Sequence, residues 1–291
     1  GPDHPDTLTS RNNLANALYG MGQYAQAADH HRQILDDRTR VLGPDHPDTL
    51  TSRNNLANAL YGMGQYAQAA DHHQQALDDR TRVLGPDHPD TLTSRNNLAN
   101  ALNGMGHCEQ AVDLHRQTLV DRTRVLGPDH PHTLASRNNL AFALDAMGRY
   151  EQAVDLHRQT LVDRTRVLGP DHPHTLGSRH NLADALRGMG EYAQAADLYQ
   201  QALTAYLRVL GPDHPNTLGS RHNLAIALEG MGEYAQAADR HRQNLDIRTS
   251  TLGPNHPDTR LSRDSLEAAL TASRTTLRSR NRPPRHRTIT D

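Results

Sequence analysis

Apolar residues recur along this chain at spacings of three and four, the period of a helix, and no segment shows the alternation of a strand. Within the first 42 residues, the pattern predicts one helix over residues 5–19 and a second over residues 24–42. Gly20-Met21-Gly22 separates the two helices, because paired glycines interrupt a helix. The pattern therefore predicts an all-α protein built from helix pairs.

Start and stop signals frame each predicted pair. Pro5 suits a first helical residue, which needs no N–H, and His4 or Asp3 precedes it as a cap. Gly43 is placed to adopt a left-handed conformation after the second helix, and Pro44 cannot continue that helix. Each unit thus ends with its own stop signal.

The same unit returns with a period of 42 residues, because Gly-Pro recurs at 1, 43, 85, 127, 169, 211 and 253 without insertion or deletion. Residues 1–42 and 43–84 differ at only two positions. One unit carries too few large apolar side chains to fold alone, so each must pack against its neighbours.

We predict a right-handed superhelical solenoid of antiparallel helix pairs. Residues 253–280 are predicted to form a C-terminal capping helix, and residues 281–291 a basic, disordered tail. Glu267 marks the cap, because Ala15 occupies its place in the first unit and a second helix must close against that small residue. The six full units are 1–42, 43–84, 85–126, 127–168, 169–210 and 211–252.

The units resemble tetratricopeptide repeats, in which two helices pack through small residues. The stretch from Leu35 to Thr49 (LDDRTRVLGPDHPDT) is similar to the long second helix and linker of kinesin light chain repeats, and of bacterial repeats that often follow a signal-transduction ATPase module. Arg11 and His31 depart from the family pattern, which usually has an apolar or aromatic residue at these positions. The resemblance extends from residue 1 to about residue 273 and rests on Asn13-Leu14-Ala15, Gly22, Tyr24, Ala27-Ala28 and Leu35.

Composition narrows the function class. The formal net charge is −2, so the whole chain has no electrostatic attraction to nucleic acid or anionic membranes, and only the arginine-rich tail could contact nucleic acid. All basic residues are arginine, a bias that fits a GC-rich bacterial genome. Cys108 is the single cysteine and cannot form an internal disulfide, and neither a signal peptide nor a long apolar run is present. We expect a cytoplasmic protein without a membrane partner.

One face of each first helix drifts from unit to unit, while the packing positions stay nearly constant. In the first unit this face carries Thr9, Asn12, Asn16 and Tyr19, which are spaced by three or four residues. Amides predominate there in the first four units, and histidine or charged residues take several of these places in the last two. In tetratricopeptide proteins this face lines the concave groove. The predicted peptide-binding groove consists of Asn12, Asn16, Tyr19, Asn54, Asn58, Tyr61, Asn96, Asn100, Asn103, Asn138, Phe142, His180, Asp184, Arg187 and His222.

A side-chain amide can pair with both the N–H and the C=O of an extended peptide without selecting its side chains. The family resemblance implies this role for the groove amides at Asn54, Asn58, Asn96 and Asn100. The competing interpretation is a solvated face with no ligand. Arg187 is the only cationic residue of the stripe, so the preference of kinesin grooves for acidic peptides is not transferred.

Catalysis, cofactors and metals find no support in the sequence. Seven histidines are each a whole unit apart, no paired metal-ligand motif occurs, and every Gly-Met-Gly lies in a turn between helices. His180 and His222 face the groove in neighbouring units, which leaves a bound cation as a minor alternative. Arg11 and its copies are predicted to form a salt-bridge or stacking ladder between units, with acids such as Asp37.

The sequence therefore predicts a non-enzymatic interaction domain whose groove binds a peptide or partner segment. The first alternative is the sensing or autoinhibitory region of a larger bacterial signal-transduction ATPase or regulator, with an effector domain upstream in the same polypeptide. The second is an architectural or self-assembling spacer.

Overall fold

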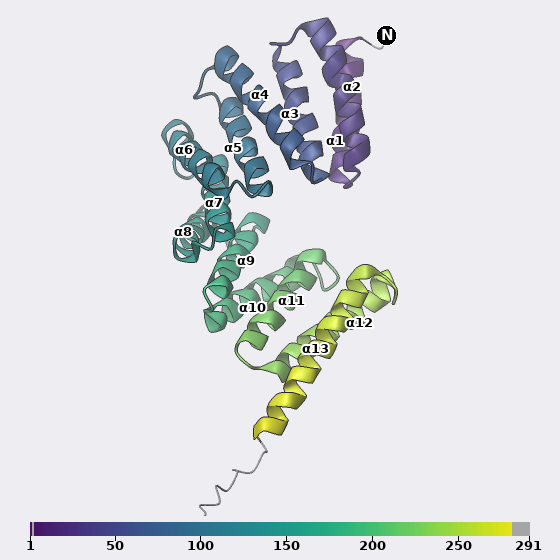
Figure 1. Cartoon of the computed structure of the whole chain (residues 1–291), viewed down its shortest axis with the longest axis vertical. Helices are drawn as coiled ribbons and strands as arrows, with labels where there is room; N and C mark the ends of the chain where they lie inside the picture. Colours follow the sequence, from purple (N-terminus) through teal and green to yellow (C-terminus); the bar gives the residue numbers. More distant parts are fainter. Residues whose placement is uncertain (2, 281–291) are drawn as a thin grey trace, which may run out of the picture. The chain divides into compact units, whose positions relative to one another are not determined.

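The structure is a computed structural model that describes residues 1 and 3–280, with the side chains of 277–280 excepted. Within these residues the chain forms 13 α-helices and no strand (Figure 1). The first predicted helix is one residue longer than expected, and the second has the predicted bounds. The helices are α1 (Pro5–Gly20), α2 (Tyr24–Leu42), α3 (Pro47–Gly62), α4 (Tyr66–Leu84), α5 (Pro89–Gly104), α6 (Cys108–Leu126), α7 (Pro131–Ala146), α8 (Tyr150–Leu168), α9 (Pro173–Gly188), α10 (Tyr192–Val209), α11 (Pro215–Gly230), α12 (Tyr234–Leu252) and α13 (Pro257–Arg280).

The chain divides into two compact units, Gly1–Leu156 and His157–Asp291, and the division falls within α8. In the first unit, α1 to α7 pack consecutively, each helix against the next. The first helices of successive repeats also contact each other, α3 with α5 and α5 with α7, so they form one layer. In the second unit, α9 to α13 pack consecutively in the same way. This is an all-α solenoid of helix pairs, as the repeat pattern predicted.

The loop histidines begin the first helix of each pair. His4 has an extended backbone, and its Nδ1 accepts a hydrogen bond from the N–H of Asp6 at 3.3 Å, which satisfies a donor that the helix start leaves unpaired. A cap explains why these residues recur once per repeat. The same bond is made by His46, His88, His130, His172, His214 and His256.

Small residues let the helices approach closely. Ala27 and Ala28 of α2 pack with Leu56, Ala59 and Leu60 of α3 in one buried cluster. Alanine and leucine dominate the core because the sequence has few aromatic side chains. The interface between repeats therefore depends on shape more than on large buried side chains.

Buried arginines join neighbouring repeats. Arg38 at the end of α2 is 5% exposed and donates hydrogen bonds to Ser52 Oγ at 2.8 Å and to the carbonyl of Asp48 at 3.1 Å. Burial lowers the pKa of the equivalent Arg122 to about 10, which still leaves it charged at neutral pH. Tyr206 replaces the arginine in the fifth repeat. The other buried members are Arg80 with Ser94, Arg122 with Ser136 and Arg164 with Ser178, and the half-buried Arg248 makes the same bond to Ser262.

The Arg11 ladder was predicted with the right partner but the wrong span. Arg11 Nη1 lies 2.6 Å from Asp37 Oδ2, and Arg95 lies 2.6 Å from Asp121, so each ion pair joins the two helices of one repeat. Arg40 bridges Asp37 to Asp3 in the same repeat. The ladder is therefore a set of separate networks within repeats, because position 11 faces its own second helix.

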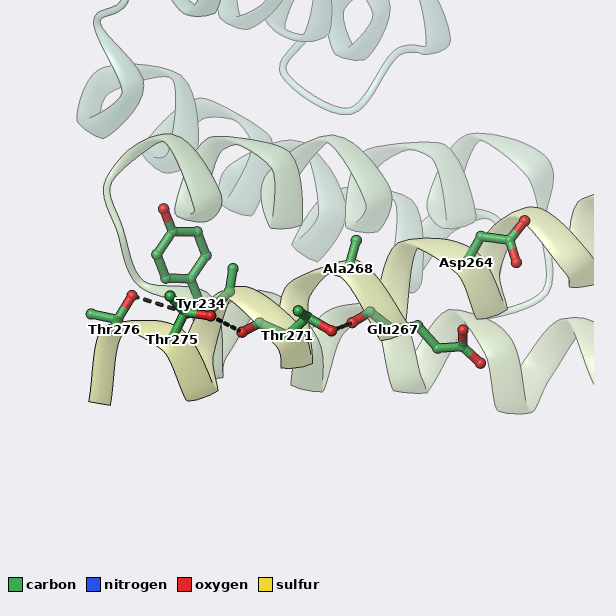
Figure 2. Close-up of a pocket in the computed structure, with 8 residues that line it drawn as sticks. Tyr234, Asp264, Glu267, Ala268, Thr271, Thr275 and Thr276 are labelled. Carbon is green, nitrogen blue, oxygen red and sulfur yellow. Dashed lines mark hydrogen bonds between the residues drawn. The ribbon is translucent and has the colours of Figure 1, made fainter. Parts of the chain in front are cut away.

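The last helix differs from the earlier first helices. Ala15 and its five copies are fully buried, whereas Glu267 at the same position of α13 is exposed. Glu267 borders a cavity of about 660 Å³ along α13, where Figure 2 shows the ring of Tyr234 beside Thr271 and Thr275. The assignment of residues 253–280 as a cap is consistent with this exposure and stays a prediction. The predicted tail, residues 281–291, lies outside the described residues.

Candidate functional site

The predicted groove residues of the first unit lie on α1, α3, α5 and α7. Asn16, Tyr19 and Tyr61 are exposed, and Asn58 and Asn100 are half-buried. Asn54 and Asn96 were expected to be exposed but are each only 8% exposed. Asn12, Asn103 and Asn138 are half-buried, and Phe142 on α7 is 58% exposed.

An asparagine ladder buries part of this face. The Nδ2 of Asn97 donates to Asn54 Oδ1 at 3.2 Å and to Asn58 Oδ1 at 3.4 Å. Asn55 donates to Asn12 at 3.3 Å, and Asn139 donates to Asn96 at 3.0 Å. The donating position corresponds to Asn13 of the first repeat, which the sequence analysis did not include in the groove; its recurrence as asparagine in six repeats is the sequence signal that could have identified it.

The ladder changes what the buried amides can offer a ligand. Asn54 and Asn96 already use their oxygens, and their Nδ2 groups have no partner within the described part of the chain. They can act as donors only. Asn100 lies one helical turn after Asn96 and is half-buried, and neither its oxygen nor its nitrogen is hydrogen-bonded in the described residues. Asn100 can therefore both donate and accept.

A pocket of about 260 Å³ opens on this face. Four of its six lining residues are predicted groove residues. The fold brings them together from α1, α3 and α5, the first helices of three successive repeats. His73 and Asn97 were not predicted. The lining residues are Tyr19, Asn58, Tyr61, His73, Asn97 and Asn100.

The pocket lining carries no formal charge at neutral pH. Burial lowers the pKa of His73 to about 4, so its imidazole is neutral. Burial also raises the pKa values of Tyr19 and Tyr61, whose hydroxyl groups therefore stay protonated. Tyr61 packs edge-on against Tyr66 with ring centroids 5.1 Å apart, which holds its ring in place. The pocket thus offers neutral donors and acceptors with two tyrosine rings.

In the second unit, the same stripe carries a network around Asp184. The carboxylate accepts from Tyr199 Oη at 2.5 Å and from Asn223 Nδ2 at 3.3 Å. His180 Nε2 and Arg187 Nη2 lie 3.5 Å and 3.7 Å from it. Burial lowers the pKa of His180, and the Asp184 charge opposes that shift. The carboxylate of Asp184 therefore already has hydrogen-bond partners within the protein.

His222 lies on α11 with its ring 5.2 Å from that of His241, which is buried and contacts Glu229 at 3.1 Å. Burial lowers the pKa of His222. Within the described residues no three histidine, cysteine or acidic side chains come together as metal ligands. None of the helices in the described part of the chain is long and apolar enough to cross a bilayer.

The sequence pattern of the tetratricopeptide repeat family matches residues 6–82, 53–120, 133–174, 162–208 and 180–250. Among curated protein sequences, none matches this chain significantly. A crystal structure from Podosopora anserina, named as a kinesin light chain with nearly identical tetratricopeptide-like repeats, is 32% identical. It covers 71% of this chain and 98% of its own length, with a TM-score of 0.63.

Two more distant structures share the fold alone. A Rap protein complexed with competence and sporulation factor is 13% identical and has a TM-score of 0.63, covering 91% of this chain and 75% of its own. A signal transduction ATPase from Pyrococcus horikoshii has a tetratricopeptide repeat sensor; it is 12% identical with a TM-score of 0.67. The match covers 92% of this chain and 39% of the ATPase.

Proposed function

Because the chain belongs to the tetratricopeptide repeat family, whose members are protein-interaction modules, we propose that its first unit binds an extended peptide segment on the face of α1, α3 and α5. The observation that carries this proposal is the 260 Å³ pocket, where Asn58, Asn97 and Asn100 meet the rings of Tyr19 and Tyr61. The proposal includes a non-enzymatic role in the cytoplasm.

The chemistry of the pocket favours the backbone of a ligand over its side chains. Neutral amides pair with peptide N–H and C=O groups whatever the sequence, whereas a charged side chain would need a counter-charge. Tyr61 supplies apolar contact area with a polar tip, which suits a small aliphatic or aromatic side chain of the ligand. We therefore propose an uncharged, extended segment as the ligand.

In this proposal the second unit contributes less to ligand binding than the first. Asp184 is engaged by Tyr199, Asn223 and His180, so opening this network for a ligand would cost hydrogen bonds already made. The residues His180, Asp184, Arg187 and His222 remain proposed contacts, secondary to those of the first unit.

A random-peptide display library selected on the immobilised chain tests the proposal. Selected peptides should bind the chain and lose binding to the variant Asn58→Ala/Asn100→Ala. The matched control is Gln26→Ala/Gln68→Ala on the exposed faces of α2 and α4. Peptides that bind the wild-type chain, the asparagine variant and the glutamine control equally would mean that the binding site lies outside this pocket.

A second candidate function is the sensing region of a larger regulator. The observation that favours it is the fold shared with the tetratricopeptide repeat sensor of the Pyrococcus horikoshii ATPase. An upstream effector domain in the same polypeptide would be the partner. Sequencing the gene on the 5′ side of the codon for Gly1 tests this candidate directly.

A further inference from the structure

In the first three repeats, one aspartate of the second helix lies between two arginines. Asp37 Oδ2 accepts a hydrogen bond from Arg11 Nη1 at 2.6 Å, and Asp37 Oδ1 accepts one from Arg40 Nη2 at 3.0 Å. Asp79 and Asp121 make the same two contacts in the second and third repeats. Each half-buried carboxylate therefore uses both of its oxygens, one for each guanidinium group.

The fifth repeat keeps the two arginines but not the aspartate. Arg179 of α9 and Arg208 of α10 stand at the positions of the arginines, and Ala205 stands at the position of the aspartate. The two helices pack against each other in the second unit (Figure 1). Arg208 pairs with Asp171, whereas the half-buried Arg179 makes no hydrogen bond or ion pair within the described residues. Arg179 thus lacks the carboxylate that its counterparts contact in the first three repeats.

The sixth repeat shows how the chain can compensate for the same loss. Ile247 stands at the position of the aspartate there, and the buried Arg221 donates a hydrogen bond to Asn244 Oδ1 at 2.9 Å instead. The fifth repeat has Ala202 at the position of Asn244. Neither of these two positions of the fifth repeat can therefore supply a hydrogen-bond acceptor to Arg179.

A pocket of about 370 Å³ opens beside this arginine. Arg179, Ala205 and Arg208 line it together with Asp171 and Gln201. Because the lining contains two arginines and one aspartate, its formal net charge is +1. Gln201 adds an amide at the position whose oxygen accepts a hydrogen bond from the arginine of the first repeat at 3.4 Å. The pocket is large enough for a small organic group, and its charge favours an anion.

We propose that this pocket binds the carboxylate of a ligand between Arg179 and Arg208. A guanidinium group suits this ligand because its N–H groups match the two oxygens of a carboxylate, as the arginines around Asp37 show. In the first repeat Arg40 contacts two aspartates at once, so Arg208 can keep its contact with Asp171 while it binds the ligand. The ligand thus completes an arrangement that the chain builds from its own residues in other repeats.

The site is separate from the proposed peptide-binding face. Arg179 and Arg208 belong to the second unit and are not among the predicted groove residues, so the failure of one proposal leaves the other standing. Two sources can present a carboxylate to the pocket. One is an acidic side chain of a partner protein, and the other is a free organic acid.

Two-dimensional ¹⁵N NMR of the full-length chain tests the proposal through the Nε–H signal of Arg179, which Arg179→Gln identifies by removing it. We expect a saturable shift of this signal on titration with sodium succinate or with the peptide acetyl-Gly-Glu-Gly-amide. A response to succinate means that a free organic acid is sufficient, and a response to the peptide alone identifies an acidic side chain as the source. No response to either probe would overturn the proposal. Sodium sulfate that shifts the signal as strongly as succinate, at the same ionic strength, would overturn the assignment of a carboxylate.

Ala205→Asp is the decisive variant, because it rebuilds the aspartate of the other repeats. Its side chain takes the place of the ligand, so binding of the active probe should weaken at least about ten-fold. The matched control is Gln236→Asp, which adds the same charge at an exposed residue of α12. This control should bind the probe like the wild-type chain. Equal weakening by the two variants would mean that overall charge governs binding, which would overturn the proposal.

Discussion

The ring of Tyr24 lies directly against the backbone of Gly62 in the next repeat, with 2.6 Å between the ring's Cδ1 and the place a Cβ would occupy. The same relationship joins Tyr66 to Gly104 and Tyr192 to Gly230. In the fourth repeat, Ala146 stands at the position of Gly62. The residue of the third repeat that faces it, at the position of Tyr24, is Cys108. At this pair a smaller side chain thus accompanies the added methyl group, whereas Ala272 faces a full tyrosine, Tyr234, and both residues line a cavity.

Gly62→Ala should destabilise the chain, because Tyr24 must move or the two helices must separate. We expect the free energy of unfolding to fall by about 1–3 kcal/mol, which is typical of overpacked sites. The measurement is the urea midpoint, which should be lower than that of the wild-type chain. Gly20→Ala is the matched control, because its helix has the same sequence and open space at the Cβ. Equal destabilisation by both variants would contradict the packing account. Adding Tyr24→Cys to Gly62→Ala should recover part of the loss.

Stability should fall on acidification below about pH 6.5. Burial lowers the pKa of His115 to about 4, and His31, His73 and His157 behave alike. In the unfolded chain these histidines bind protons near pH 6.5, whereas in the folded chain they stay neutral until about pH 4. Their contribution to the free energy of unfolding is therefore complete above pH 6.5 and is lost as the pH falls toward 4. Each histidine contributes at most about 1.4 kcal/mol per pH unit in this range. His115→Phe should flatten the pH dependence of the urea midpoint; an unchanged slope would contradict the assignment.

The helix boundaries and the period could be predicted from the sequence because local signals repeat in every unit. Pro5, Gly22 and Gly43 act through their own backbone, without help from distant residues. The span of the Arg11 ion pair could not be predicted, since it depends on which side of the helix meets its own partner. The burial of Asn54 likewise follows from the neighbouring repeat, which contributes Asn97.

Asn54→Ala should reduce the stability of the folded chain, because Asn54 is buried and its oxygen accepts a hydrogen bond from Asn97. Removing the side-chain oxygen of Asn54 deprives Asn97 of one hydrogen-bond acceptor, which should lower the free energy of unfolding by about 0.5–1.5 kcal/mol. Asn16→Ala, on the exposed surface of α1, is the control and should leave the urea midpoint unchanged or slightly higher. A stable Asn54→Ala variant would mean that the ladder adds nothing to the fold.

Deleting residues 257–291 should expose the last full repeat. Arg248 would lose its bonds to Ser262 Oγ at 2.8 Å and to the carbonyl of Asp258 at 3.1 Å. We expect the Tm at low protein concentration to fall by several degrees. An unchanged Tm would remove the capping role assigned to α13.

Titration calorimetry with a display-selected peptide tests the central claim, that the face of α1, α3 and α5 holds an extended segment. Asn58→Ala/Asn100→Ala removes two amides from the 260 Å³ pocket, which should weaken binding by about five-fold to a hundred-fold at about 0.5–1.5 kcal/mol per lost bond. Gln26→Ala/Gln68→Ala should bind like the wild-type chain. Equal affinities for the two variants would contradict the claim and place the binding site outside this pocket.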